Sequence, residues 1–412
     1  MTYPLRPKRR CGSTYIMPKI NPDIESFARI KVIGIGGSGK NALNHMIASK
    51  VKGVEFIVMN TDTQDLHNSL AEKKVHLGKN LTHGLGAGMN PEIGKRAAEE
   101  TKAEIQDVIK GADMVFIACG MGGGTGTGAA PIVAQAAKEQ GILTVAVVTK
   151  PFSFEGNQRM KLAEAGLSEL EKEVDAILII PNDRLIVISG KDVGFRQAFA
   201  LCDEVLKQAV EGISELITTP GMINVDFADI KAVMSDAGSA LMGVGIAAGE
   251  GRAEKAALQA INSPLLDLSI SGAKGVLFAI SGGDDLTIHE IQESAKVITE
   301  SIDKEAKVIF GTISDDKLKK GEMKVTVIAT GFPTDMPKRS LFQIHQKATE
   351  PTVNGSSKED ILKAVGKDSS KDTSADYIKK NEKETPKVED DLFIDDTDDW
   401  STVPAFLRRN KK

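Results

Sequence analysis

The chain has 412 residues, of which 41% are hydrophobic and 4% aromatic, and its formal net charge is −5. This length suffices for two globular domains, and the negative charge gives no electrostatic reason to expect nucleic acid as a partner. No apolar run reaches the ~18 residues of a transmembrane helix, so direct membrane insertion is not expected. The three cysteines and six histidines show no disulfide or zinc spacing, which favours a cytoplasmic protein and assigns no metal-binding residues.

Residues 1–27 have no helical or strand periodicity and are predicted to form a disordered arm. The first strand follows at Ile30–Ile35 and runs into a glycine loop at 34–41 that matches two motifs incompletely. It fits the Rossmann fingerprint, but the second strand ends in Asn60, where that motif expects an acidic residue. It also approaches a Walker A loop, but Asn41 replaces the Ser or Thr that ligates magnesium. Under either motif the loop is expected to cradle phosphates.

A second glycine loop covers residues 84–92. In it, Asn90 suits a helix N-cap and Pro91 suits the first helical position. A capped turn alone would give the same pattern, so this loop is informative mainly beside the other two.

The third loop is the densest and follows a predicted buried strand at 113–118. Six of the nine residues from Gly120 to Gly128 are glycine, and a helix with Pro131 near its start is predicted over 129–137. A strand, a glycine loop and a helix in this order aim free backbone N–H groups at an anion. Three such loops predict a parallel sheet whose carboxyl edge surrounds one nucleotide.

The run Gly-Gly-Gly-Thr-Gly-Thr-Gly at 122–128 matches the tubulin signature, and its flanks resemble the FtsZ family of bacterial, tubulin-like cell-division GTPases. The resemblance covers roughly residues 28–335 and about the last dozen. It implies an α/β, tubulin-like fold with a Rossmann-type parallel-sheet GTP-binding domain at 28–192. A long central helix at 193–218 would join this domain to a smaller α/β domain at 219–333.

The resemblance also implies GTP and Mg²⁺ as cofactors, with the loop at 84–92 sensing the γ-phosphate. The implied nucleotide contacts are Gly37, Ser38, Gly39, Lys40, Asn41, Gly88, Gly124, Thr125, Gly126, Glu155, Arg159, Asn182, Phe199 and Asp203. Ser38 and Lys40 depart from the family's usual Gly and Asn. Lys40 could bring charge to the phosphates or point to solvent, and the sequence leaves both open.

Some of these residues have a plainer interpretation. Glu155 and Arg159 are spaced i, i+4, which also suits a surface ion pair, although the family's equivalent stretch touches the ribose. Asn182 stands just past the predicted strand at 176–180. On the central helix, Phe199 and Asp203 are one turn apart, so a ring and a carboxylate can meet one purine. Guanine offers N1–H and N2–H to a carboxylate and adenine does not, which favours GTP over ATP.

Asn224, Asp226 and Asp229 follow the central helix and are the catalytic residues that the resemblance implies. The plainer interpretation is that the two aspartates favour the first turn of a helix through its dipole. A helix of about 25 residues spans ~37 Å, so these residues and the glycine loops are expected at opposite ends of the molecule. They would then complete hydrolysis on the nucleotide of the next subunit in a head-to-tail filament.

The remaining chain is predicted to hold a second α/β domain and a tail. Strands are expected at 241–248, 275–280, 307–311 and 324–329, with helices near 252–262 and 286–302. Residues 334–396 are rich in charged and small polar residues and predict a disordered linker. Apolar side chains return in the segment 397–412, and its residues 400–409 resemble the family's peptide for membrane-tethering adaptors.

The sequence thus predicts a GTPase that polymerises head-to-tail into the cell-division ring at mid-cell, with itself, membrane adaptors and division regulators as partners. Three alternatives stay open. A Rossmann dehydrogenase would need the missing ribose acid, and a P-loop NTPase would need the missing Ser or Thr. A tubulin-like scaffold that does not hydrolyse GTP would be expected to lack the loop residues that this chain has.

Overall fold

The computed structural model describes residues 28–189, 194–219, 221–263, 270, 272–283, 285–315 and 318–332. The predicted arm (1–27), linker (334–396) and tail (397–412) lie outside these described residues.

Strands and helices alternate along the first part of the chain. They are β1 (Ile30–Ile35), α1 (Gly36–Ala48), β2 (Val54–Asn60), α2 (Thr63–His67), β3 (Lys73–His76), α3 (Lys79–Thr82), α4 (Pro91–Glu100), α5 (Lys102–Ile109), β4 (Met114–Gly120), α6 (Thr125–Lys138), β5 (Leu143–Lys150), the short 3₁₀ turn η1 (Ser153–Glu155), α7 (Asn157–Leu170), β6 (Ala176–Pro181) and α8 (Asn182–Ser189).

The second part starts with the long helix predicted at the centre of the chain. Its elements are α9 (Phe195–Thr218), α10 (Phe227–Met234), β7 (Gly238–Ala248), α11 (Arg252–Ile261), β8 (Gly275–Gly282), α12 (Ile288–Glu300), β9 (Lys307–Ser314) and β10 (Glu322–Thr330). The mixed α/β class and the long central helix are therefore confirmed.

All ten strands belong to one sheet in the order β3-β2-β1-β4-β5-β6-β7-β10-β8-β9. Neighbouring strands are parallel except at β10, which runs antiparallel to both β7 and β8. The two predicted α/β parts share this sheet through β6 and β7, which pair over only three positions, Ala176–Leu178 with Gly238–Ala240.

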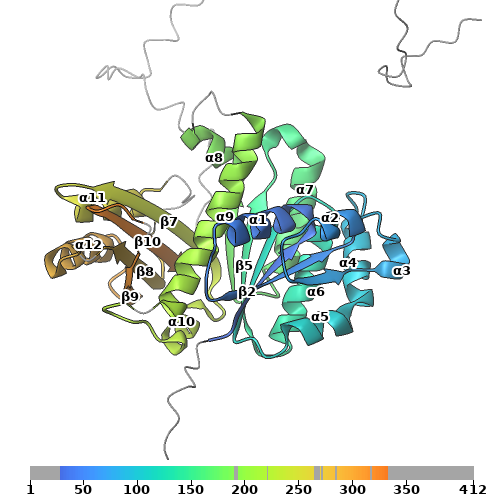
Figure 1. Cartoon of the computed structure of the whole chain (residues 1–412), viewed down its shortest axis with the longest axis horizontal. Helices are drawn as coiled ribbons and strands as arrows, with labels where there is room; N and C mark the ends of the chain where they lie inside the picture. Colours follow the sequence, from blue (N-terminus) through green and yellow to red (C-terminus); the bar gives the residue numbers. More distant parts are fainter. Residues whose placement is uncertain are drawn as a thin grey trace, which may run out of the picture. The chain divides into compact units, whose positions relative to one another are not determined.

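The strands of the first part are buried because helices cover both faces of the sheet (Figure 1). Every residue of β1 is buried, and so are six of the seven residues of β4. One apolar core joins the sheet to α1 and α9, and a second joins its other face to α4, α5, α6 and α7. This two-sided burial explains why the strands read as continuous apolar runs in the sequence.

Helix α9 packs its apolar stripe against both parts of the chain. The side chains of Cys202, Leu206, Ala209, Ile213 and Leu216, which recur at helical spacing, are all buried. The same core also contains Leu277 and Ile328 from the second part, so α9 is shared by both. With 24 residues the helix is ~36 Å long. Among the described residues, no helix combines the length and the apolar composition that crossing a membrane requires.

Two helices begin earlier than the sequence indicates. The loop expected around Gly36–Asn41 already lies in α1, and Thr125–Gly128 form the first turn of α6. Pro131, expected near a helix start, therefore stands six residues after the first residue of α6. The first four N–H groups of a helix have no acceptor within it. The early starts therefore keep those donors beside the glycine loops, where an anion is expected.

Candidate functional site

The site lies where the strand order reverses. Order β3-β2-β1-β4-β5-β6 changes direction between β1 and β4, and open α/β sheets bind ligands at the carboxyl ends of the strands at such a point. Helix α1 begins directly after β1, and α6 begins five residues after the end of β4 at Gly120. Neither helix has a side-chain hydrogen bond at its N-cap, so both present backbone donors and a positive dipole end there.

A cavity of about 490 Å³ opens at this point. It is lined by seven of the predicted nucleotide contacts, namely Gly37, Ser38, Gly88, Gly124, Thr125, Gly126 and Arg159. The first, second and third glycine loops therefore meet at one cavity, although they are separated by tens of residues in the chain. A cavity between two helix N-termini suits a group with several anionic oxygens.

The second loop reaches the cavity because Gly124 in the third loop has no side chain. A Cβ on Gly124 would lie 2.8 Å from the Cβ of Ala87 and 2.9 Å from the backbone N of Asn90. Asn90 caps α4 by accepting a hydrogen bond from the backbone N of Glu92 (3.0 Å), with Pro91 in the first helical position. The predicted cap is confirmed, and any residue larger than Gly at 124 would push the second loop away.

Asn60, the last residue of β2, and Thr61, which follows it, also line the cavity and are not among the predicted nucleotide contacts. The Thr61 and Thr125 hydroxyls share a hydrogen bond of 2.6 Å, and Asn60 Oδ1 accepts from the backbone N of Thr61 at 2.8 Å. Thr61 is fully buried and Asn60 is nearly so. These residues were detectable only as polar positions at the carboxyl end of a parallel strand, where sites form.

Three predicted contacts from α1 lie outside the lining of this cavity. A Cβ on Gly39 would be 2.4 Å from the carbonyl O of Ala118, so this glycine lets α1 pack on β4. Asn41 is exposed to solvent. Lys40 does not point to solvent: its Nζ lies 2.5 Å from Asp65 Oδ1, and its side chain is 12% exposed.

Glu155 and Arg159 connect the cavity to a second group of residues. Arg159 Nη1 donates to Glu155 Oε2 at 2.6 Å, which confirms the ion pair that their spacing allows. Glu155 Oε1 also accepts from the backbone N of Phe152 at 3.0 Å. Phe152 in turn packs edge-on against Phe199, with the ring centroids 5.2 Å apart.

This second group contains four phenylalanines. Phe152 is fully buried, whereas Phe154, Phe195 and Phe199 are 58%, 70% and 38% exposed. Phe195 and Phe199 are one turn apart on α9, with ring centroids 5.0 Å apart. In a chain with 4% aromatic residues, such a partly exposed cluster is an unusual feature and offers faces for a planar ring.

Two polar groups belong to the same region of α8 and α9. Asp203 lies one turn after Phe199, and burial raises the pKa of its carboxyl to about 6, although the charge of His45 opposes this shift. Asn182 is 5% exposed, and its Oδ1 has no hydrogen-bond partner among the described residues. A buried amide oxygen without a partner costs free energy unless a ligand donates to it.

These residues fit a guanine nucleotide. Two helix N-termini face a phosphate-sized cavity, and Arg159 and Glu155 lead from it to an aromatic cluster. Asp203 can accept from the two adjacent N–H donors of guanine, and Asn182 Oδ1 can accept a further N–H group. Adenine would leave Asp203 without that donor pair.

The acidic residues after α9 are not brought to this cavity within one chain. Asn224 Oδ1 accepts from the backbone N of Gly221 at 2.7 Å, and Asp226 Oδ1 caps α10 by accepting from Ala228 N at 3.2 Å. Asn224, Asp226 and Asp229 are all exposed. They follow the far end of α9, next to α10, whereas the aromatic cluster lies at its beginning (Figure 1).

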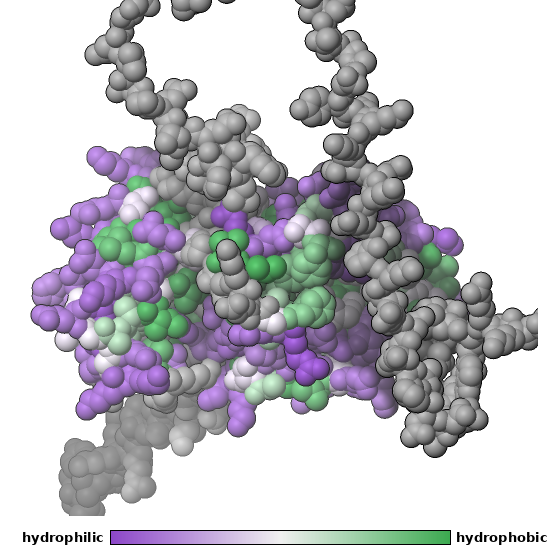
Figure 2. Space-filling model, turned by 90° about the horizontal axis from the view of Figure 1, so that it is seen from above, coloured by the Kyte–Doolittle hydropathy of each residue, from purple (hydrophilic) through white to green (hydrophobic). Residues whose placement is uncertain are grey.

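Exposed apolar residues lie at the cavity and also beside the acidic residues that follow α9. Leu85 and Met89 line the cavity and are 86% and 41% exposed, and at the other end Met222 is 74% exposed beside the acidic residues. Figure 2 views the molecule from above the orientation of Figure 1. On this upper face, hydrophilic side chains lie around the periphery and hydrophobic patches lie between them.

The chain matches the GTPase domain of the Tubulin/FtsZ family over residues 29–190 and the C-terminal domain of the FtsZ family over residues 238–333. It is similar to an empty FtsZ dimer from M. jannaschii at 46% identity and a TM-score of 0.71, covering 74% of this chain and 88% of that one. A mutant FtsZ from the same organism gives 46% identity, a TM-score of 0.72 and coverage of 74% and 92%. CetZ2 from Haloferax volcanii, solved as a GTPγS-bound protofilament, shares the fold at 20% identity and a TM-score of 0.65, with coverage of 74% and 94%.

Proposed function

The chain belongs to the tubulin/FtsZ family, and from this premise we propose that the region at the beginning of α9 binds the nucleotide and that the residues after the end of α9 act in its hydrolysis. It is a GTP-hydrolysing cytoskeletal protein of cell division, and its family assembles into protofilaments.

The phosphates bind in the 490 Å³ cavity, held by the backbone N–H groups at the starts of α1 and α6. The observation that carries this assignment is the meeting of these two uncapped helix N-termini at one cavity. Side chains from Ser38, Thr125 and Arg159 line it and can add donors. Gly37, Gly88, Gly124 and Gly126 let the backbone approach, while Gly39 and Asn41 belong to the same loop.

The ribose and base bind between Glu155, Asn182, Phe199 and Asp203. Phe199 offers a partly exposed ring, Asp203 a carboxylate for guanine N1–H and N2–H, and Asn182 Oδ1 an acceptor that lacks any other partner among the described residues. Guanine binding satisfies the partly buried carboxylate of Asp203 and the buried Asn182 Oδ1, and this gives the site its preference for GTP over ATP.

Mg²⁺ binds together with the phosphates, whose charge it offsets during phosphoryl transfer. Among the described residues, no group of three or more His, Cys, Asp or Glu side chains is arranged to hold a metal ion. In the cavity, Ser38, Thr61 and Thr125 offer hydroxyl groups beside the phosphates and their ion.

Hydrolysis is completed by the next subunit in a head-to-tail filament. Asn224, Asp226 and Asp229 are exposed at the end of α9, ~36 Å from its beginning, so they cannot reach the nucleotide of their own chain. The exposed Leu85 and Met222 lie at the two complementary ends, and burying them gives a heterologous contact that repeats along a filament. At that contact the acidic residues orient the attacking water.

The tail connects filaments to the membrane. We propose that residues 400–409 bind membrane-tethering adaptors, that residues 334–396 act as a tether, and that division regulators share these contacts. The protein then works in the cytoplasm at the mid-cell division ring, without inserting into the membrane itself.

Calorimetric titration with GTP, ATP and NAD tests the nucleotide assignment. We expect GTP to bind at least tenfold more tightly than ATP and NAD, because only guanine pairs with Asp203. Equal binding of GTP and ATP would remove the assignment of Asp203, and preferred binding of NAD would restore the Rossmann alternative.

A mixing experiment tests the shared site. Asp229→Ala subunits keep the nucleotide cavity, and Thr125→Arg subunits keep the acidic end but fill the cavity with a larger side chain. Each variant alone should hydrolyse GTP poorly. A mixture with activity above the sum of both supports hydrolysis across the interface, and a mixture equal to that sum contradicts it.

A further inference from the structure

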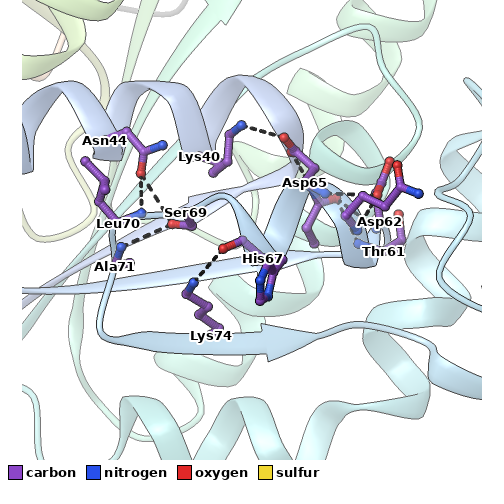
Figure 3. Close-up of polar contacts among 12 residues, drawn as sticks. Lys40, Asn44, Thr61, Asp62, Asp65, His67, Ser69, Leu70, Ala71 and Lys74 are labelled. Carbon is purple, nitrogen blue, oxygen red and sulfur yellow. Dashed lines mark hydrogen bonds and ion pairs between the residues drawn. The ribbon is translucent and has the colours of Figure 1, made fainter.

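We propose that Lys40 is a positioning residue of the phosphate site, which neutralises Asp65 beside the cavity and does not itself bind phosphate. The inference rests on the proposed binding of GTP in that cavity. Figure 3 shows the contact: the Lys40 side chain extends from α1 towards Asp65 on α2.

The pair is close and partly withdrawn from water. Lys40 Nζ lies 2.5 Å from Asp65 Oδ1, and the two side chains are 12% and 26% exposed. Asp65 lines the cavity, whereas Lys40 is not among its lining residues. A pair in this position is screened less by solvent than an exposed surface pair.

The second oxygen of Asp65 supports the floor of the cavity. Asp65 Oδ2 accepts from Asn60 Nδ2 at 2.7 Å. Asn60 Oδ1 then holds the backbone N of Thr61, whose hydroxyl bonds to Thr125. One chain of contacts thus runs from Lys40 through Asp65 to the first residue of α6, and both carboxylate oxygens of Asp65 are engaged in it.

This arrangement leaves a carboxylate next to the proposed phosphates. A Cβ on Gly37, in the first turn of α1, would lie 3.4 Å from Asp65 Oδ2. Like charges at such a site repel, and a carboxylate that loses its cation becomes an uncompensated, partly buried charge. Lys40 removes this repulsion. Without Lys40, a ligand should lose more affinity the more phosphates it carries.

Asn44 provides a matched control because it tethers the same helix without charge. Asn44 Oδ1 accepts from the backbone N of Leu70 at 2.8 Å and from Ser69 Oγ at 3.4 Å (Figure 3). Asn44 is one turn beyond Lys40 on α1, and its partners follow α2. If holding α1 to this segment were all that mattered, Asn44→Ala and Lys40→Met would have similar effects.

The test is calorimetric titration of the full chain with GTP, GDP and guanosine. Lys40→Met should weaken GTP binding roughly tenfold to thirtyfold, GDP binding less, and guanosine binding less than twofold. Asp65→Asn should bind GTP at least as tightly as the parent chain, because the negative charge of Asp65 beside the phosphates is removed while Lys40 keeps its positive charge. The double variant Lys40→Met/Asp65→Asn should return to within threefold of the parent, and Asn44→Ala should stay within threefold.

The opposite results overturn the inference. A double variant as weak as Lys40→Met would mean that Lys40 contacts phosphate directly, and a Lys40→Met chain within threefold of the parent would mean that neutralisation is not needed. Equal losses for guanosine and GTP, or for Asn44→Ala and Lys40→Met, would reduce Lys40 to a structural tether. Should Lys40→Met not fold, the double variant carries the test alone: parent-like GTP binding supports the inference and a tenfold loss overturns it. A parent chain that binds no GTP would instead contradict the proposed function.

Discussion

The two ends of α9 are built in different ways. At its beginning, the site is assembled within one chain from glycines, helix N-termini and buried polar groups such as Thr61, which is already bonded to Thr125. At its end, Asn224, Asp226 and Asp229 are exposed, and two of them are engaged only in local turns and caps. Under the proposed function, the first region therefore binds the nucleotide within one chain, whereas the second acts on the nucleotide of another subunit.

The largest expected effect separates binding from hydrolysis. Asp229→Ala should lower GTP turnover roughly 10²- to 10³-fold, because it removes a group proposed to act at the transition state. Asp229 is exposed in the first turn of α10 and is not its N-cap, so the fold should not suffer. GTP affinity, measured by calorimetry, should stay within threefold of the parent.

Glu254→Ala is the control for this comparison. Glu254 is likewise an exposed acidic residue in the first turn of a helix, α11, but it lies away from the acidic end of α9. Its turnover should match the parent. Equal losses of turnover in both variants would mean that Asp229 acts only through the overall negative charge of the surface. A loss of GTP binding in Asp229→Ala would mean that the nucleotide site and the acidic residues after α9 are not separate regions.

A smaller effect is expected at the base. Asp203→Asn should weaken GTP binding roughly tenfold to a hundredfold, because Asn offers guanine an N–H group where it needs an acceptor. The same change should stabilise the empty protein at pH 7.5 by about 1–2 kcal/mol, since it removes a partly buried charge. Calorimetry and thermal unfolding measure the two effects. Lower affinity with lower stability would indicate damage to the fold instead.

The pH dependence of GTP binding follows from the same residue. The pKa of the Asp203 carboxyl in the folded protein is raised to about 6. The neutral carboxyl therefore stabilises the fold fully below about pH 4, and this contribution to the free energy of unfolding is lost as the pH rises through 6. The affinity for GTP should have the opposite trend, because the proposed contact with guanine needs the ionised carboxylate. GTP affinity should fall by up to about tenfold per pH unit below 6. Asp203→Asn should flatten this profile, and His45→Gln should move it to higher pH, because the charge of His45 lowers the pKa of Asp203. A profile unchanged in Asp203→Asn would contradict the assignment.

Most of the fold could be predicted because local sequence patterns indicate its strands and helices. The runs in β1 and β4 are fully or almost fully apolar, and the stripe on α9 repeats at helical spacing. The helix starts at Gly36 and Thr125 could not be predicted, because glycine is a poor helix former and only the packing of α1 and α6 on the sheet holds these turns.

The candidate site was predictable where glycines mark it and not where it depends on distant contacts. Thr61 meets Thr125 across 64 positions of sequence, and Lys40 meets Asp65 across 25. Nothing in the local pattern joins these residues, because the parallel order of β2, β1 and β4 brings them together. The place of Phe195 in the exposed aromatic cluster could not be predicted for a related reason, since an aromatic residue on a helix is usually part of the hydrophobic core.

The smallest effect is expected from the tail. Deleting residues 402–412 should leave GTP turnover and sedimentation of polymers within twofold of the parent, since neither end of α9 includes this segment. Recruitment to the mid-cell ring, followed by fluorescence microscopy of the tagged chain, should be lost. A deletion that impairs hydrolysis would instead make the tail part of one of the two regions.

The central claim is that the acidic end of one subunit completes the site of the next, and GTP turnover per subunit as a function of protein concentration tests it most directly. Because a dilute monomer binds GTP but has no neighbouring acidic residues, its turnover should be close to zero and should rise above a threshold concentration. The threshold should coincide with the onset of polymer sedimentation. Constant turnover per subunit down to concentrations at which only monomers exist would contradict the account.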